Sequence, residues 1–245
     1  MKNAPFKFET KFIKKEKLTD EIYTFYFDRV KRGSAEYFDF IPGQYVRLTL
    51  RIDNPDGRGS SRYFTISSSP TDLEYFTITT RIIKSSFKKS LLALKSGEKV
   101  KVYGPMGYFD FEYKDSAPKI LLAGGIGITP FYSLLRFIDA KKLKQKITLF
   151  VSFADREEMI FFDELKEVEK RNSNIKVIYT LTKEKCSEFE YGRINEQLIK
   201  RYAKDYKDSK FFIVGSEEME EALYGIVSKM GIKDKNIFKE NFSGY

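Results

Sequence analysis

A cluster of glycines separates an apolar run from an amphipathic segment in residues 119–131, which read KILLAGGIGITPF. Glycine allows a sharp turn and a close approach of the backbone to a bulky ligand. Thr129 is placed to cap the helix that should follow, and Pro130 suits its first turn. The free N–H groups and the positive end of such a helix attract phosphate. The stretch therefore predicts a nucleotide site built around Gly124, Gly125 and Gly127.

A second motif, RYFTISSSP in residues 62–70, combines a cation, aromatic rings and hydroxyl groups. Side chains alternate along a strand, so Arg62 and Phe64 should share one face and Tyr63 and Thr65 the other. Arginine can clamp a phosphate through its planar fork, and an aromatic ring can stack on a flat ligand. The alternative is an ordinary strand with a half-buried phenylalanine and a solvated arginine.

A third motif, TRIIKSSFKKS in residues 80–90, precedes the one clear helix of the first half, near 87–94. Ser85 or Ser86 could cap this helix, whose N-terminal N–H groups would then face an anion. Lys88 and Lys89 add positive charge there. A capped surface helix without any ligand is the competing interpretation.

Two absences restrict the chemistry. The chain has no histidine, which excludes histidine-based triads and metal sites. It has one cysteine, Cys186, so neither an internal disulfide nor a four-cysteine metal or iron–sulfur site can form. We expect no metal site, a bystander thiol at Cys186, and an organic centre if the protein moves electrons.

The periodicity of the sequence changes near residues 112–118. Residues 1–116 alternate apolar and polar residues in short runs between turn signals, which predicts an antiparallel six-stranded β-barrel with one helix. Residues 117–245 alternate strand and helix patterns, which predicts a Rossmann-like α/β domain with a parallel five-stranded sheet. The expected strands are 119–123, 147–152, 175–181, 211–215 and 236–239, and the expected helices are 130–142, 157–170, 194–203 and 217–230.

The net charge is +9, with the larger excess in the first half. Such a field suits an acidic protein, a nucleotide or a membrane surface, but it also serves solubility. A nucleic-acid-binding module is disfavoured because basic residues are interleaved with acidic ones. No apolar run is long enough for a transmembrane helix and no signal peptide opens the chain, so we expect a cytoplasmic protein.

Taken in order, these motifs resemble those of the ferredoxin–NADP reductase superfamily, the flavin-dependent NAD(P)H oxidoreductases. The resemblance spans nearly the whole chain and includes a C-terminal Glu-x-Phe-x-Gly-Tyr. The other matching segments are FIPGQY at 40–45, GPMGYF at 104–109, YGRI at 191–194 and VGS at 214–216.

The resemblance implies that the barrel binds FAD, which it favours over FMN. Arg62 would hold the diphosphate, Phe64 would pack on the isoalloxazine ring, and Thr65 would hydrogen-bond near the reactive N5 atom. The full set that it implies around FAD is Arg62, Tyr63, Phe64, Thr65, Thr80, Ser86, Phe87 and Lys88. Catalysis would involve Thr65, Glu240 and Phe242, the last as the aromatic ring that yields to nicotinamide.

The resemblance also implies that the α/β domain binds NADPH or NADH at Gly125, Gly127, Thr129, Ser152, Arg156, Thr182 and Gly215. An arginine at the end of the second strand suits the 2′-phosphate of NADP, and an acid suits the ribose of NAD. Arg156 and Ser152 therefore favour NADPH slightly, whereas Asp155 favours NADH. Two departures stand out: Val214 and Ser216 replace a common cysteine and proline, and Phe64 replaces a common tyrosine.

The implied function is hydride transfer from NAD(P)H to FAD and onward transfer of single electrons. We expect a monomer whose acceptor is a small acidic carrier such as ferredoxin or flavodoxin. The alternatives are a reductase component for an oxygenase or a haem protein, a free flavin or ferric reductase, and a flavin-binding subunit that has lost coenzyme turnover.

Overall fold

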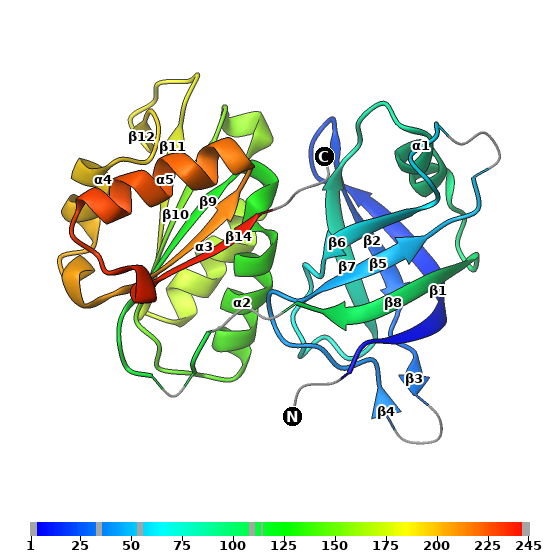
Figure 1. The fold of residues 1–245 in the computed structure, drawn as a ribbon. Coiled ribbons are helices and arrows are strands. Elements are labelled where there is room, and N and C mark those ends of the chain that lie inside the picture. The colour runs from blue at the N-terminus through cyan, green and yellow to red at the C-terminus, as the bar shows by residue number, and fades with distance from the viewer. Residues whose placement is uncertain (1–3, 33–35, 53–55, 108–110, 114, 242–245) are drawn as a thin grey trace. The chain divides into compact units, whose positions relative to one another are not determined.

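The computed structural model describes residues 4–32, 36–52, 56–107, 111–113 and 115–241. The chain divides into two compact units, which hold most of residues 1–109 and most of residues 110–245 (Figure 1). Within the described residues, no helix is long and apolar enough to cross a membrane.

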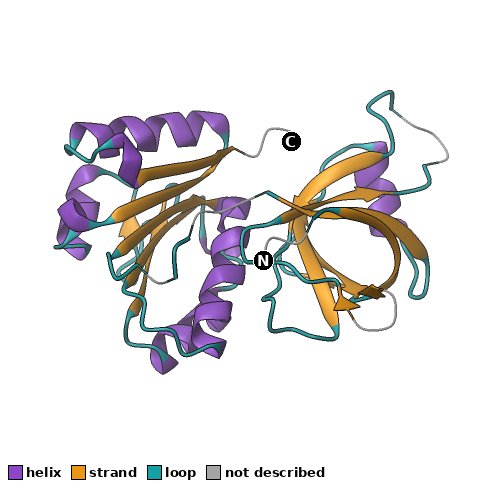
Figure 2. Ribbon diagram, turned by 60° about the horizontal axis from the view of Figure 1, so that its bottom comes forward, coloured by secondary structure: helices purple, strands orange, loops and turns teal. Residues whose placement is uncertain are grey.

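The first unit is the predicted six-stranded antiparallel barrel, which Figure 2 shows as a curved ring of strands. The strand order is β6-β5-β8-β1-β2-β7, and a bridge between Ile66 and Ile78 joins the two ends of this order. The strands are β1 (Phe6–Lys17), β2 (Ile22–Asp28), β5 (Tyr45–Thr49), β6 (Ser61–Thr65), β7 (Tyr75–Arg81) and β8 (Lys99–Met106). A small hairpin, β3 (Lys31–Arg32) and β4 (Glu36–Tyr37), lies outside this sheet.

The alternation of buried and more exposed residues explains why these segments form a barrel. In β5, Val46 and Leu48 are buried while their neighbours are half-buried, which is the period-2 pattern of a strand with one inner face. The helix α1 (Ser86–Ala93) inserts Phe87 and Leu91 into the same apolar core. The helix that the third motif predicted therefore packs into the barrel core. This packing fixes the position of the start of the helix relative to β6.

The second unit is a parallel sheet with helices on both faces, as predicted, but it has six strands instead of five. The order is β12-β11-β10-β9-β13-β14. The strands are β9 (Lys119–Gly124), β10 (Ile147–Phe153), β11 (Ile175–Leu181), β12 (Glu190–Tyr191), β13 (Lys210–Gly215) and β14 (Ile237–Asn241). The additional strand is β12, whose two residues are too few to show any periodicity in the sequence.

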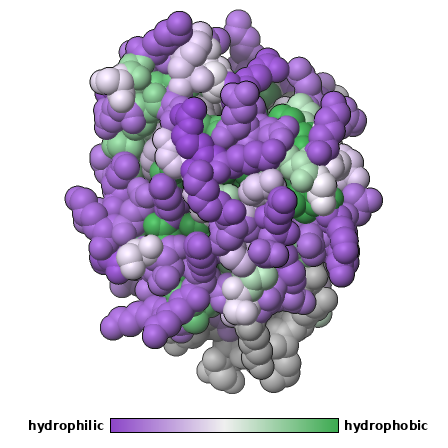
Figure 3. Space-filling view, turned by 90° about the vertical axis from the view of Figure 1, so that its left-hand side faces the viewer, coloured by the Kyte–Doolittle hydropathy of each residue, from purple (hydrophilic) through white to green (hydrophobic). Residues whose placement is uncertain are grey.

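Helices α4 (Glu196–Tyr202) and α5 (Glu217–Lys229) share an apolar core with one face of this sheet, and α3 (Phe162–Arg171) packs on the other (Figures 1 and 2). The helix α2 (Thr129–Ala140) follows β9. Short 3₁₀ turns are η1 (Gly125–Ile128), η2 (Arg156–Glu158), η3 (Tyr206–Asp208) and η4 (Asp234–Asn236). The face shown in Figure 3 is mainly hydrophilic, with only small separate hydrophobic areas.

Candidate functional site

Strand β6 presents two different faces, as its alternation predicts. Arg62 and Phe64 lie opposite Leu48 and Val46, whose side chains are buried in the barrel core. Directly opposed residues of antiparallel strands point to the same side of the sheet. Phe64 is accordingly 4% exposed, whereas Tyr63 on the other face is 61% exposed. The resemblance assigned both the Phe64 ring and the Tyr63 ring to the FAD site. The structure buries the Phe64 ring in the barrel core and leaves the Tyr63 ring exposed.

Backbone carbonyl groups just before Arg62 in the chain hold its guanidinium. Its Nη1 atom donates hydrogen bonds to the carbonyl oxygens of Arg58 and Ser61, both at 2.7 Å. Its Nη2 atom is buried and has no hydrogen-bond partner among the described residues; the nearest carboxylate oxygen, on Asp56, is 4.0 Å away. A buried donor without an acceptor is costly, so this atom is a suitable contact for a phosphate oxygen.

Lys88 brings a second positive group to the same place. The residue is 5% exposed, and its Nζ atom donates a hydrogen bond to Thr80 and lies 4.7 Å from the centre of the Phe64 ring. Burial, and then repulsion from Arg62, lower the pKa of Lys88 to about 7. An anion between the two cations would reverse this shift, because opposite charge favours the protonated amine.

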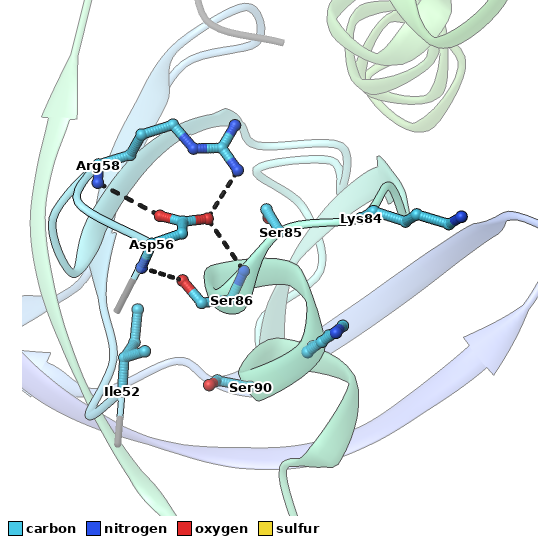
Figure 4. Close-up of a pocket in the computed structure, with 8 residues that line it drawn as sticks. Ile52, Asp56, Arg58, Lys84, Ser85, Ser86 and Ser90 are labelled. Atoms are coloured by element: carbon cyan, nitrogen blue, oxygen red, sulfur yellow. Dashed lines mark hydrogen bonds and ion pairs between the residues drawn. The ribbon is translucent and has the colours of Figure 1, made fainter. Parts of the chain in front are cut away.

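The N-terminus of α1 is capped by two side chains (Figure 4). The Ser85 hydroxyl accepts a hydrogen bond from the Lys88 amide, as predicted for one of the two serines. The Ser86 amide donates to the Asp56 carboxylate at 3.1 Å, and Arg58 donates to the same carboxylate at 2.6 Å. These contacts, led by Arg58, hold the pKa of Asp56 well below its usual range. The Asp56 carboxylate thus already occupies a position at the start of α1 where an anion could bind.

A pocket of about 540 Å³ opens at this helix start (Figure 4). Its lining is rich in hydroxyl and charged groups: Ile52, Asp56, Arg58, Lys84, Ser85, Ser86, Lys89 and Ser90. Sequence reasoning missed Asp56 and Arg58, because Asn-Pro-Asp-Gly marked this segment only as a turn. Asp56 pairs with the start of a helix that lies thirty residues later in the chain. No pattern in the neighbouring sequence predicts such a contact.

Thr65, on the outer face of β6, also has an unsatisfied hydroxyl. The residue is buried, and its Oγ1 atom has no hydrogen-bond partner among the described residues. Tyr63 on the same face packs edge-on against Tyr45, with ring centres 5.8 Å apart. The barrel therefore carries unsatisfied polar atoms on Arg62 and Thr65, two of the four β6 residues that the resemblance assigned to FAD contacts.

The glycine turn of the second unit joins β9 to α2 through η1. Gly125 has a φ of +49°, which disfavours other residues. A Cβ atom on Gly127 would lie 2.8 Å from the Val214 carbonyl oxygen, so only glycine lets η1 pack against the end of β13. The predicted role of Thr129 as a cap is wrong: it has helical backbone angles because the 3₁₀ turn continues directly into α2.

The strand register gathers several predicted residues at the carboxyl edge of the sheet. Ser152 lies level with Gly124, and Val214 lies level with Glu240, so the end of β13 and Gly215 lie at the same edge. Ligands of such sheets bind at this edge. Burial raises the pKa of Glu240 to about 7. Phe242 lies outside the described residues.

The remaining predicted coenzyme residues follow β10 and β11. Thr182 donates a long hydrogen bond of 3.4 Å to the Phe153 carbonyl oxygen. Arg156, in η2, forms ion pairs with Glu184 and Glu188. Ser216, one of the two departures, caps α5 by accepting a hydrogen bond from the Met219 amide. A serine at this position therefore has a structural role that proline could not supply.

Comparison with known proteins identifies both units. Residues 9–111 match the oxidoreductase FAD-binding domain and residues 121–224 match the oxidoreductase NAD-binding domain. The chain belongs to the ferredoxin–NADP reductase superfamily.

Two curated relatives show how distant the similarity to individual proteins is. Flavohemoprotein A of Dictyostelium discoideum is 27% identical over 83% of this chain and 52% of its own length. The glycine betaine monooxygenase reductase subunit of Pseudomonas aeruginosa is 27% identical over 84% of this chain and 57% of its own. The chain thus spans about half the length of these curated relatives.

A solved ferredoxin NADP⁺ reductase from Neisseria gonorrhoeae, with bound FAD and NADP, shares the fold. Its TM-score is 0.78 at 19% identity, over 96% of this chain and 98% of that one. The predicted barrel and α/β architecture is therefore confirmed as that of the superfamily.

Proposed function

We propose that this chain is a flavoprotein reductase that takes a hydride from NAD(P)H and passes electrons singly to a separate acceptor. When bound, FAD supplies the chemistry, because it accepts two electrons together and releases them one at a time. The observation that carries the proposal is a pair of cations, the half-buried Arg62 and the buried Lys88, with a buried and unsatisfied Nη2 donor on Arg62 in a family-matched FAD-binding domain.

The protein's own residues would bind and orient the two nucleotides. Arg62 and Lys88 would supply positive charge and N–H donors for a diphosphate. Thr65 keeps an unsatisfied hydroxyl on the outer face of β6, where it could hydrogen-bond a flavin ring nitrogen. The turn at Gly125 and Gly127 leaves room for the backbone to approach a coenzyme diphosphate.

Two kinds of acceptor have support. The net charge of +9 suits a small acidic electron carrier such as ferredoxin or flavodoxin. The relatives favour a second candidate, a haem protein or an oxygenase component, since they include flavohemoproteins and a monooxygenase reductase subunit.

The test is reconstitution with FAD followed by anaerobic titration with NADH and with NADPH. We expect a yellow protein whose flavin absorption is bleached by at least one coenzyme and restored by an added acceptor. Ferredoxin, flavodoxin, a haem protein and ferric citrate, each added to the reduced protein, would then rank the candidates. A protein that stays colourless with excess FAD, or a bound flavin that neither coenzyme reduces, would contradict the proposal.

The affinity for FAD should also depend on pH. Lys88 is largely neutral above its pKa of about 7 in the free protein, and the diphosphate favours its charged form. Binding should therefore take up a proton, and the Kd should rise by up to about tenfold per pH unit above pH 7. Fluorescence titration of FAD between pH 6.5 and pH 9 measures this slope.

Lys88→Met should bind FAD more weakly at pH 7 and lose most of this slope. Lys95→Met is the matched control, because Lys95 is exposed just beyond the same helix and does not line the pocket. An unchanged slope in Lys88→Met would exclude Lys88 as the titrating group.

A further inference from the structure

Arg156 is surrounded by acidic side chains from the segment after β11. Its Nε atom lies 3.3 Å from Glu184 and its Nη2 atom 3.2 Å from Glu188. The Arg156 amide also donates a hydrogen bond to Glu184 at 3.0 Å. The guanidinium carbon lies 5.0 Å from the centre of the Phe189 ring, which covers one of its faces. Two carboxylates and a ring therefore engage the guanidinium that sequence reasoning assigned to a 2′-phosphate.

The other charges at this edge are of both signs, with three acids (Asp155, Glu157 and Glu158) against two bases (Lys183 and Lys185). Asp155 caps η2 by accepting a hydrogen bond from the Glu158 amide, and Glu157 is exposed beside it. On the segment after β11, Lys185 lies over the Tyr191 ring at 4.8 Å, and Lys183 is exposed. Acids therefore outnumber bases among the groups that follow β10 and β11.

A 2′-phosphate and a 2′-hydroxyl need opposite surroundings. The phosphate carries nearly two negative charges and needs cationic donors, whereas the ribose hydroxyl is recognised by a carboxylate acceptor. To bind a phosphate, Arg156 would have to leave Glu184 and Glu188. Each exposed ion pair is weak, but the phosphate would then face both released carboxylates.

We infer that the coenzyme site selects NADH over NADPH, with Glu184 and Glu188 as the specificity-determining residues. This inference rests on the proposed function, since it concerns the coenzyme of the same reductase. It reverses the slight preference for NADPH that Arg156 and Ser152 indicate in the sequence, because an arginine attracts phosphate only where nearby carboxylates do not neutralise it.

Binding of the oxidised coenzymes gives a direct test, independent of turnover. Calorimetry on the FAD-loaded protein should show NAD⁺ binding at least about tenfold more tightly than NADP⁺. The double variant Glu184→Gln/Glu188→Gln should improve NADP⁺ binding at least about fivefold and change NAD⁺ binding less than about twofold. Glu167→Gln, which removes an exposed charge from α3, should leave the ratio of the two affinities nearly unchanged.

The possible failures are distinguishable. Equal or tighter binding of NADP⁺ by the unaltered protein, or a double variant with an unchanged ratio, would overturn the specificity assignment. In that case reduction of the flavin by NADPH would leave the proposed reductase function standing. If neither coenzyme binds and neither reduces the flavin, both the specificity assignment and the proposed function are wrong.

Discussion

Arg62→Ala is expected to raise the Kd for FAD by about 10- to 100-fold. The substitution removes a guanidinium whose Nη2 donor is buried without a hydrogen-bond partner among the described residues. A hydrogen bond to a charged group contributes about 1.5–3 kcal/mol, and 1.4 kcal/mol corresponds to a factor of ten in affinity. Fluorescence titration of the apoprotein with FAD measures the change.

The control for Arg62→Ala is Arg171→Ala, which removes the same charge from an exposed ion pair on α3 in the other unit. The Kd of this variant for FAD should stay within about twofold of the Kd of the unaltered protein, since surface ion pairs contribute little to stability. Retention of full FAD affinity by Arg62→Ala, with the barrel still folded by circular dichroism, would remove Arg62 from the proposed FAD site.

Gly127→Ala is expected to destabilise the α/β unit by about 1–3 kcal/mol, the usual cost of overpacking a tightly packed site. The new Cβ atom would lie 2.8 Å from the Val214 carbonyl oxygen and 3.3 Å from the Gly215 Cα atom. Both contacts are with backbone, so relief requires η1 to move away from β13. The free energy of unfolding in urea measures the loss, and coenzyme binding should weaken with it.

Gly225→Ala in α5 is the matched control. Among the described residues, no atom outside the local helix backbone lies within 4 Å of the position that its Cβ would take, and its φ is not in the left-handed region. Alanine there should stabilise the helix by about 0.5–1 kcal/mol, because glycine loses more backbone entropy on folding. If Gly127→Ala proves as stable as Gly225→Ala, the close packing of η1 on β13 does not constrain this turn.

Local patterns were sufficient for the architecture of both units. Alternation in segments such as 45–49 identified barrel strands, since a period of two depends only on neighbouring residues. The same local reasoning correctly predicted the opposite faces of Arg62 and Tyr63. It failed for β12, which is too short to show a period, and for Thr129, where a 3₁₀ turn removes the need for a cap.

The sequence by itself determined the two-domain plan, the exclusion of histidine and cysteine chemistry, and the motifs that identify the superfamily, because these depend on composition and on residues close together in the chain. Only the tertiary structure decided that Lys88 lies buried beside Arg62, that Asp56 occupies the start of α1, and that Glu184 and Glu188 engage Arg156. Each of these arrangements joins residues 26 or more positions apart. Their charges interact only because burial and strand order bring the segments within a few ångströms, and the proposed affinity for FAD and preference for NADH depend on that proximity.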